Sequence, residues 1–231
     1  MFADFPTIAP DSVPWIDEAD MIEVDRVMID DLHIELLQMM ENAGRHLARL
    51  VLEGANPRTV AVAAGSGGNG GGGLVAARHL ANAGVEVAVV TTRSIEDMTA
   101  APAHQLDILE RMGVAVVDAL PSVDVVVDAL IGYSLRGAPR GRSAELIRQS
   151  AEASIVVSLD TPSGLDVNTG DVPGDAVRAD AALTLALPKV GLRSSELVGE
   201  LYLADISVPP AVAREFGSAP RFPPGGIARL A

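Results

Sequence analysis

The chain has 231 residues, 48% of them hydrophobic, and a formal net charge of −14. A chain of this length can bury a full core as one domain, and its hydrophobic content excludes a disordered protein. The negative charge argues against nucleic acid or an anionic membrane as the main partner, since both bind through basic patches. The sequence contains no cysteine, which excludes disulfides, thiolate metal sites and a cysteine nucleophile.

Signals for export and for membrane insertion are not found in the sequence. The N-terminal region lacks the basic segment of a secretory signal, and no apolar run approaches the roughly 18 residues of a membrane-spanning helix. We therefore expect a cytoplasmic location and no membrane partner. Lys189 is the only lysine among 17 cationic residues, and a salt-adapted source is an open hypothesis for this acidic, lysine-poor composition.

Apolar periodicity predicts two N-terminal helices followed by alternating strands and helices. The N-terminal helices are expected at residues 18–30 and 34–54, where apolar side chains recur at helical spacing. Strands are expected at residues 59–64, 85–91, 114–117, 123–128, 154–159, 181–187 and 200–206, and further helices near 73–83, 98–112 and 142–152. This alternation is typical of an α/β fold with a mostly parallel sheet and helices on both faces. We expect one domain over residues 1–231, with its core at about 18–206 and an irregular tail at 219–231.

A glycine-rich segment follows the first strand after the N-terminal helices. Seven of the nine residues from Gly65 to Gly73 are glycine, and the other two are Ser66 and Asn69. Glycine lets backbone N–H groups approach a ligand, and the N-terminus of the following helix attracts anions. Because a tight turn needs fewer glycines, we interpret the segment as a loop that binds a nucleotide or another anion.

Two aspartates stand at the ends of later strands. Asp128 ends one apolar run, and Asp160 ends the next and is followed by Pro162, Ser163 and Gly164. In parallel sheets, ligands bind beyond the carboxyl ends of strands, where the strand order reverses. A strand order of 3-2-1-4-5 would bring the glycine segment, Asp128 and Asp160 to one crevice. A purely structural role as a cap or turn former stays open, above all for Asp128.

The glycine segment also contains the pattern G-x-G-x-x-G of dinucleotide-dependent dehydrogenases. That pattern expects an acidic residue at the end of the second strand, where this chain has Arg93, which would suit a 2′-phosphate. An NADP-dependent oxidoreductase is therefore one alternative. The sequence lacks the G-K-[ST] of a P-loop, and its four histidines do not have metal-ligand spacing.

Five motifs occur in a fixed order along the chain. They are Met40-Glu-Asn-Ala-Gly44, the glycine segment leading into Leu74-Val-Ala-Ala-Arg-His-Leu80, Val127-Asp-Ala-Leu-Ile-Gly132, Leu159-Asp-Thr-Pro-Ser-Gly164 and Leu187-Pro-Lys-Val-Gly191. With them the sequence resembles the NAD(P)H-hydrate epimerase family, also called the YjeF N-terminal domain family. The resemblance implies a Rossmann-like three-layer α/β/α sandwich, often a homodimer. It also implies an isomerase that interconverts the R and S forms of hydrated NADH and NADPH in cofactor repair. A separate NAD(P)H-hydrate dehydratase is the expected partner in the pathway, since the chain ends soon after the last predicted strand.

The resemblance further implies which residues form the site. Asp160 is expected to contact the substrate and to move a proton, as a well-placed carboxylate can. Asn69, Asp128 and Ser163 are expected to hold a potassium ion, because a hard monovalent cation prefers oxygen ligands. The other expected substrate contacts are Gly68, Asn69, Gly70, Gly71 and Gly72 in the glycine segment, and Gly132, Tyr133, Ser134, Leu135, Arg136, Gly137 and Ala138 after Asp128.

The glycine segment departs from the family pattern at two positions. The family usually reads G-x-G-N-N-G-G-D-G, whereas this chain has Gly68 in place of the first Asn and Gly72 in place of the Asp. Two side chains that normally meet the substrate are thereby missing. A non-catalytic ligand-binding or scaffold domain is the resulting alternative, while the retained Asp128 and Asp160 favour the enzyme.

Overall fold

The computed structural model describes residue 2 and residues 5–231, so residues 1, 3 and 4 of the predicted domain lie outside the described part. Within that part, one nine-stranded sheet has the order β1-β9-β8-β7-β6-β5-β2-β3-β4. The strands are β1 (Thr7–Ile8), β2 (Thr59–Ala64), β3 (Glu86–Thr91), β4 (Ala115–Val116), β5 (Val125–Ala129), β6 (Val156–Leu159), β7 (Ala181–Leu185), β8 (Glu200–Ala204) and β9 (Ile227–Leu230). Neighbouring strands are parallel except for β8 and β9, which confirms the mostly parallel sheet.

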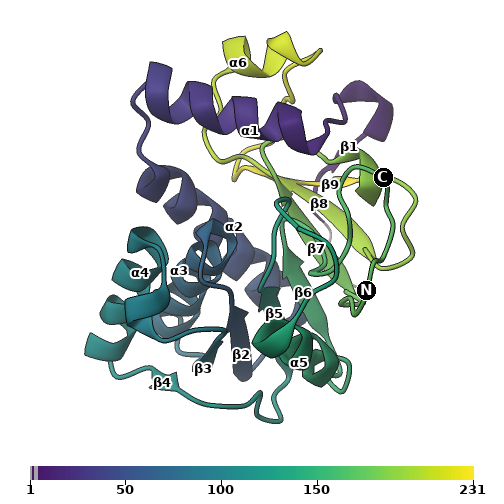
Figure 1. Ribbon diagram of the computed structural model, residues 1–231. Helices are drawn as coiled ribbons and strands as arrows, with labels where there is room; N and C mark the ends of the chain where they lie inside the picture. The colour runs from purple at the N-terminus through teal and green to yellow at the C-terminus, as the bar shows by residue number, and fades with distance from the viewer. Residues whose placement is uncertain (1, 3–4) are drawn as a thin grey trace.

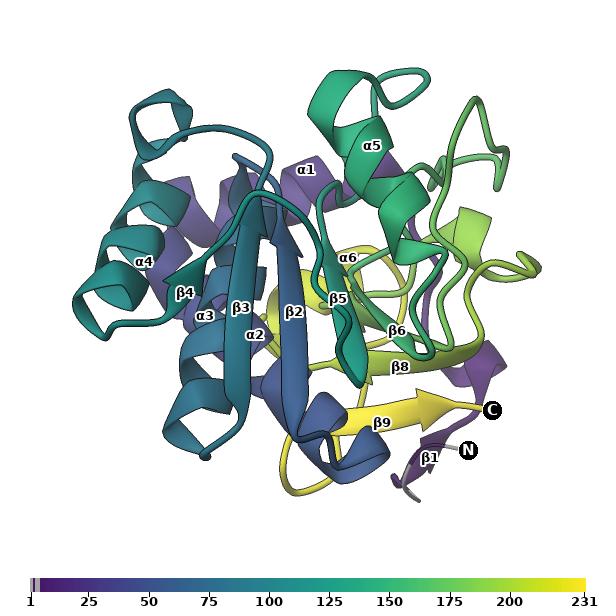
Figure 2. The ribbon, with the colours of Figure 1, turned by 90° about the horizontal axis from the view of Figure 1, so that it is seen from below.

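Helices cover both faces of this sheet, as the two ribbon views show (Figures 1 and 2). They are α1 (Glu18–Arg26), which continues into a π-helical turn (Val27–Asp31), α2 (Leu36–Ala55), α3 (Gly68–Asn82), α4 (Ala100–Arg111), α5 (Gly141–Ser150) and α6 (Pro210–Glu215). The apolar sides of α2, α3 and α4 pack on one face in the largest core cluster, and α5 packs on the other. α1 and α6 share a third cluster with the start of α2, beyond the carboxyl ends of the strands (Figure 1).

The strand order confirms the crevice that the sequence predicts. β4, β3, β2, β5 and β6 stand side by side, which is the order 3-2-1-4-5 of the five strands concerned. The connection from β2 runs through α3 on one face, whereas the connection from β5 runs through α5 on the other. The strand order therefore reverses between β2 and β5, the point at which ligands bind in folds of this kind.

The glycine segment differs from the predicted loop, because most of it is helical. α3 begins at Gly68, five residues earlier than expected, and only residues 65–67 form the connection from β2. The helix tolerates these poor helix formers because its first turns are tightly packed. A Cβ at Gly70 would collide with the carbonyl oxygen of Gly65, and one at Gly73 would collide with the Cβ of Ala129. Several glycines thus permit close packing between elements.

The C-terminal tail also differs from the prediction. It contains β9, which pairs antiparallel with β8 and parallel with β1. The irregular segment therefore ends before Ile227, and the predicted core of residues 18–206 leaves out three elements: β1, α6 and β9. In the described part of the chain, no helix is both long enough and apolar enough to cross a membrane.

Candidate functional site

A cavity of about 180 Å³ lies where the ends of β5, β6 and β7 meet α1, α2 and the start of α3. We call it the apolar cavity. Its wall is largely hydrophobic, formed by Met21, Leu36, Met39, Met40, Ala43, Leu159, Leu185 and Ile206. The polar side chains that line it are Asp25, Asn69, Tyr133, Ser134, Asp160 and Lys189. A few polar groups converging on an apolar pocket are typical of a small-molecule site.

Asp160 and Lys189 form a buried ion pair at this cavity. Lys189 Nζ lies 2.5 Å from Asp160 Oδ1, and the two side chains are 0% and 4% exposed. The ammonium group also donates to the carbonyl oxygen of Leu185 at 2.9 Å and to Thr184 Oγ1 at 3.4 Å. The second carboxylate oxygen of Asp160 accepts a bond from the backbone N–H of Tyr133 at 3.0 Å. Both charges are therefore compensated although they are removed from water.

Local backbone geometry directs this carboxylate into the cavity. Asp160 has a φ of 66°, in the left-handed region that Asp tolerates better than most residues. β6 ends at Leu159, so this residue turns the chain sharply at the carboxyl edge of the sheet. Backbone strain of this kind is concentrated at functional sites, where the surrounding structure maintains it.

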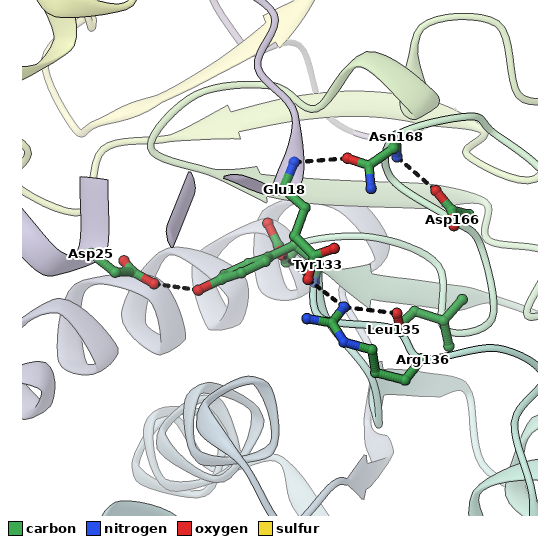
Figure 3. A network of polar contacts seen from close by, with 8 residues as sticks. Glu18, Asp25, Tyr133, Leu135, Arg136, Asp166 and Asn168 are labelled. Carbon is green, nitrogen blue, oxygen red and sulfur yellow. Dashed lines mark hydrogen bonds and ion pairs between the residues drawn. The ribbon is translucent and has the colours of Figure 1, made fainter. Parts of the chain in front are cut away.

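Tyr133 connects the ion pair to helix α1. Its phenol hydroxyl donates to Asp25 Oδ2 at 2.5 Å, as Figure 3 shows. Burial raises the pKa of Asp25, and burial together with the nearby carboxylates raises the pKa of Tyr133. A second contact, between Arg136 and Glu18, also joins this loop to α1 (Figure 3).

Asp128 lies behind the cavity, fully buried within β5. Ser163 donates to it twice, from its hydroxyl at 2.5 Å and from its backbone N–H at 2.8 Å. The hydroxyl of Ser158 donates at 2.8 Å, and the backbone N–H of Leu130 at 3.2 Å. Burial raises the pKa of Asp128 despite these four bonds, because all four donors are neutral.

The three predicted potassium ligands meet along one short segment, residues 130–132. Asp128 accepts from Leu130, and Ser163 Oγ accepts from the N–H of Ile131 at 2.9 Å. Asn69 lies beside Gly132, since a Cβ added at Gly132 would be 3.1 Å from the Cγ of Asn69. The Nδ2 atom of Asn69 is buried without a hydrogen-bond partner in the described chain. The side-chain oxygen atoms of Asn69, Asp128 and Ser163 suit a hard monovalent cation as ligands. The described residues contain no group of three or more His, Cys, Asp or Glu that could hold a metal ion.

A second cavity of about 580 Å³, the arginine cavity, adjoins the first and shares Gly68, Asn69, Gly132 and Ser134 with it. The first turns of α3 and α5 both contribute to its wall. Its lining includes Arg93, Arg140 and Arg142, and none of its described lining residues is acidic. In a chain with a net charge of −14, such a surface is suited to an anion.

The remaining predicted substrate contacts are spread over several places. Gly68, Asn69, Gly72, Gly132, Tyr133, Ser134 and Asp160 line the apolar cavity. Leu135, Arg136, Gly137 and Ala138 line a third cavity, which shares Arg140 with the arginine cavity. Gly70 and Gly71 are instead buried, with Gly71 facing the side chain of Met40.

The sequence interpretation missed four polar side chains that line the two cavities: Asp25, Arg140, Arg142 and Lys189, the last of which was noted only as the single lysine and as part of a motif. Asp25 falls in a helix where a carboxylate is ordinarily solvated, and only its contact with a residue 108 positions away identifies it. Arg140 and Arg142 reach the arginine cavity from the start of α5. Their spacing around that helix start offered a weak signal at most, since exposed arginines are common.

The fold and the position of the site define a Rossmann-like α/β protein whose ligand site lies where strand order reverses. The sequence profile described as "YjeF-related protein N-terminus" matches residues 36–191. The chain belongs to this family.

Named relatives agree with that assignment. The chain is 47% identical over 224 residues to the NAD(P)H-hydrate epimerase of Dehalogenimonas lykanthroporepellens, covering 93% of this chain and 89% of that protein. It is 41% identical to the NAD(P)H-hydrate epimerase of Truepera radiovictrix, in a match that covers 85% of this chain and 91% of that protein. A bifunctional NAD(P)H-hydrate repair enzyme from Hyperthermus butylicus is also 41% identical, but the match covers 81% of this chain and only 38% of that protein. The crystal structure of a yeast protein, YNL200c, superposes with a TM-score of 0.81 at 25% identity, over 94% of this chain and all of that one.

Proposed function

We propose that the chain is an NAD(P)H-hydrate epimerase, an isomerase that interconverts the R and S forms of hydrated NADH and NADPH. The observation that carries this function is the Asp160–Lys189 ion pair inside an apolar cavity that opens onto an anion-binding surface. The relatives that match nearly along their whole length have this activity in their names. They favour the enzyme over the non-catalytic alternative.

The two adjoining cavities suit the two ends of such a substrate. The hydrated nicotinamide ring fits the apolar cavity, where the Met and Leu side chains exclude water. The phosphate groups suit the arginine cavity, where the backbone N–H groups of two helix starts and three arginines favour negative charge. The four residues shared by the cavities would then lie along the middle of the substrate.

Asp160 is the proposed proton-transfer group. Hydration of an enamine puts the hydroxyl on the ring carbon next to the nitrogen, and inversion at that carbon requires proton transfer to and from oxygen. Asp160 is positioned for this by Lys189 on one oxygen and the N–H of Tyr133 on the other. Positioned acid–base groups contribute about 10²- to 10⁴-fold to the rate of such steps.

A potassium ion is proposed as the cofactor, held by Asn69, Asp128 and Ser163. Asp128 is fully buried and its four hydrogen-bond donors are all neutral, so a bound cation would balance its charge, which supports this assignment. When bound, the cation would supply positive charge that offsets Asp128 and attracts oxygen atoms of the substrate. Asn69 borders both cavities, so it would connect the ion site with the ligand.

The cellular setting proposed for the enzyme is the cytoplasm, with a separate NAD(P)H-hydrate dehydratase that restores the cofactor. The high coverage of the two relatives named only as epimerases supports a separate dehydratase. A homodimer is proposed as well. Exposed apolar side chains between α1 and the start of α2 support it, namely Ile22, Ile29, Leu32, Leu36 and Leu37.

The proposed activity is tested by supplying purified R-hydrate together with a dehydratase specific for the S form. We expect clearance of the R-hydrate well above its spontaneous rate in potassium buffer, and loss of most of this acceleration with Asp160→Asn. Replacing potassium by a larger or smaller cation separates the ion proposal from the epimerase proposal. No acceleration by the unaltered protein in potassium would contradict the epimerase and favour a ligand-binding domain.

A further inference from the structure

Two carboxylates from segments far apart in the sequence line the apolar cavity and are joined by one tyrosine. Tyr133 donates its backbone N–H to Asp160 at 3.0 Å and its phenol hydroxyl to Asp25 at 2.5 Å. Tyr133 is therefore hydrogen-bonded to both carboxylates, through its backbone and through its side chain. Asp25 comes from α1, whereas Asp160 follows β6, and both border the same empty volume.

The surroundings of the two carboxylates differ. Asp160 is ion-paired with Lys189. Asp25 accepts a hydrogen bond from the neutral hydroxyl of Tyr133, and burial raises the pKa of this carboxyl group. Two carboxyl groups with different hydrogen-bond and charge partners on one cavity can serve as an acid and a base.

We propose that Asp25, together with the Tyr133 hydroxyl, is a second acid–base group that works opposite Asp160 in the epimerisation. This inference rests on the proposed function and adds a catalytic pair to it. Its closest chemical parallel is inversion at an acetal carbon, where two separated carboxyl groups leave room for a water molecule between them. One group protonates the departing oxygen, and the other takes a proton from the water that attacks the opposite face.

The step balances with groups that the cavity provides. The C–O bond of the substrate breaks as its oxygen takes a proton from the Asp25–Tyr133 pair and leaves as water. The lone pair of the ring nitrogen forms a C=N bond, and the carbon becomes planar. Water then forms a new C–O bond on the other face, and the Asp160 carboxylate accepts its proton. After one turnover Asp160 holds a proton and the Asp25–Tyr133 pair has lost one. These are the protonation states that the reverse direction requires, which suits an enzyme that interconverts two epimers.

The charged and titratable neighbours of this pair come from three parts of the chain. Lys189 and Asp160 act on Asp25 through space, and Asp25, Asp160 and Glu18 act on Tyr133. Burial and Asp160 raise the pKa of Asp25, while the hydrogen bond from Tyr133 and the charge of Lys189 lower it. Burial is the largest of these influences, and the net direction is upward.

The test compares Asp25→Asn, Asp25→Ala, Tyr133→Phe and the double variant Asp25→Asn/Tyr133→Phe with the unaltered protein in the R-hydrate assay. We expect kcat to fall about 100-fold in each variant, the size typical of a lost acid–base group, with KM within about threefold. The double variant should be no slower than the single ones, because groups that act as a unit are not additive. Added formate should restore at least a tenfold gain to Asp25→Ala.

Glu23→Gln is the matched control, since Glu23 lies two residues from Asp25 on the same helix with a side chain that is 48% exposed. It should retain full activity. Melting temperatures identify any variant that fails to fold, and Tyr133→Phe, which keeps the ring, then carries the test. Retention of kcat within threefold by Tyr133→Phe or Asp25→Asn, or a lack of formate rescue, would overturn the proposed pair. An inactive unaltered protein would instead contradict the epimerase function itself.

Discussion

The apolar cavity and the arginine cavity adjoin, yet they handle charge in opposite ways. In the first, two charges are buried and compensate each other across 2.5 Å. In the second, Arg93 and Arg140 are exposed, Arg142 is half-buried and paired with Glu145, and two helix N-termini add partial positive charge. Charges that are buried and paired are sensitive to the loss of either partner, whereas exposed charges act mainly through long-range attraction.

This difference predicts how substitutions divide between the two cavities. Changes in the apolar cavity should affect the chemical step and protein stability. Changes in the arginine cavity should affect the binding of the substrate and its dependence on salt. The predictions below run from the largest expected effect to the smallest.

Asp160→Asn should have the largest effect. The amide keeps the size of the side chain but cannot accept a proton, so kcat should fall by about 10³-fold with little change in KM. Steady-state kinetics with R-hydrate measure this. A loss confined to KM would mean that Asp160 only binds the substrate.

Lys189→Met should destabilise the protein strongly. Removal of one partner from a buried ion pair leaves Asp160 uncompensated, and such losses cost about 3–5 kcal/mol of the free energy of unfolding. Urea unfolding monitored by circular dichroism measures the change. Arg193→Met is the control, because Arg193 pairs with Asp11 at the surface. Equal stability of the Lys189 and Arg193 variants would contradict the structural importance of the buried pair.

Arg93→Ala and Arg140→Ala should each raise KM about tenfold and leave kcat unchanged, because a charge-assisted hydrogen bond contributes about 1.5–3 kcal/mol. The KM of the unaltered protein should also rise with ionic strength more steeply than that of the variants. Arg111→Ala on α4 serves as the control, since Arg111 is an exposed residue paired with Asp107. A fall in kcat would contradict this prediction and show that these arginines act in the chemical step.

Asp25→Asn should gain melting temperature relative to the unaltered protein, and this gain should become larger as the pH increases. Above about pH 4 an unfolded Asp loses its proton, while the raised pKa lets folded Asp25 keep its proton to higher pH. The folded state then binds more protons, so its stability falls with pH across that window. Asn does not titrate, and the melting-temperature difference should therefore grow from pH 4 upward and then level off. A constant difference would contradict the raised pKa.

Gly68→Asn should have the smallest effect. A Cβ at this position meets nothing within 4 Å, so the side chain usual in the family can be accommodated in this structure. We expect the free energy of unfolding to change by no more than about 0.5 kcal/mol, as for other open positions. Gly70→Asn is the contrasting variant, since the backbone of Gly65 blocks any side chain there. Similar stability in both variants would contradict this packing account.

The sequence was sufficient for the strands that carry the site. Val125, Val126 and Val127 are apolar on both faces of the sheet, and the order of the five central strands is the common doubly wound one that the sequence analysis considered. The predicted start of α3 was wrong because glycine ordinarily disfavours helices. Only the close approach of Gly65 to Gly70 and of Ala129 to Gly73 shows why glycine is required at these positions of the helix. β9 was missed because its four residues follow a segment rich in proline and glycine.

The candidate site was less predictable than the fold. Asp160 could be singled out from the turn residues that follow it. The bond between Asp25 and Tyr133 spans 108 positions, and the partners of Lys189 include a residue 29 positions away. Contacts of this range depend on how α1 packs against the sheet, which no local pattern in the sequence encodes.

The pairing of β1 with β9 has a consequence for the order of folding. β1 is formed by residues near the start of the chain, but its partner strand includes Leu230. During synthesis this edge of the sheet cannot be completed until the last strand has left the ribosome. Contacts so distant in sequence also form slowly, because a long loop must close first. The central strands can therefore pair before this edge, where β1 lies beside β9 at the border of the sheet (Figure 2).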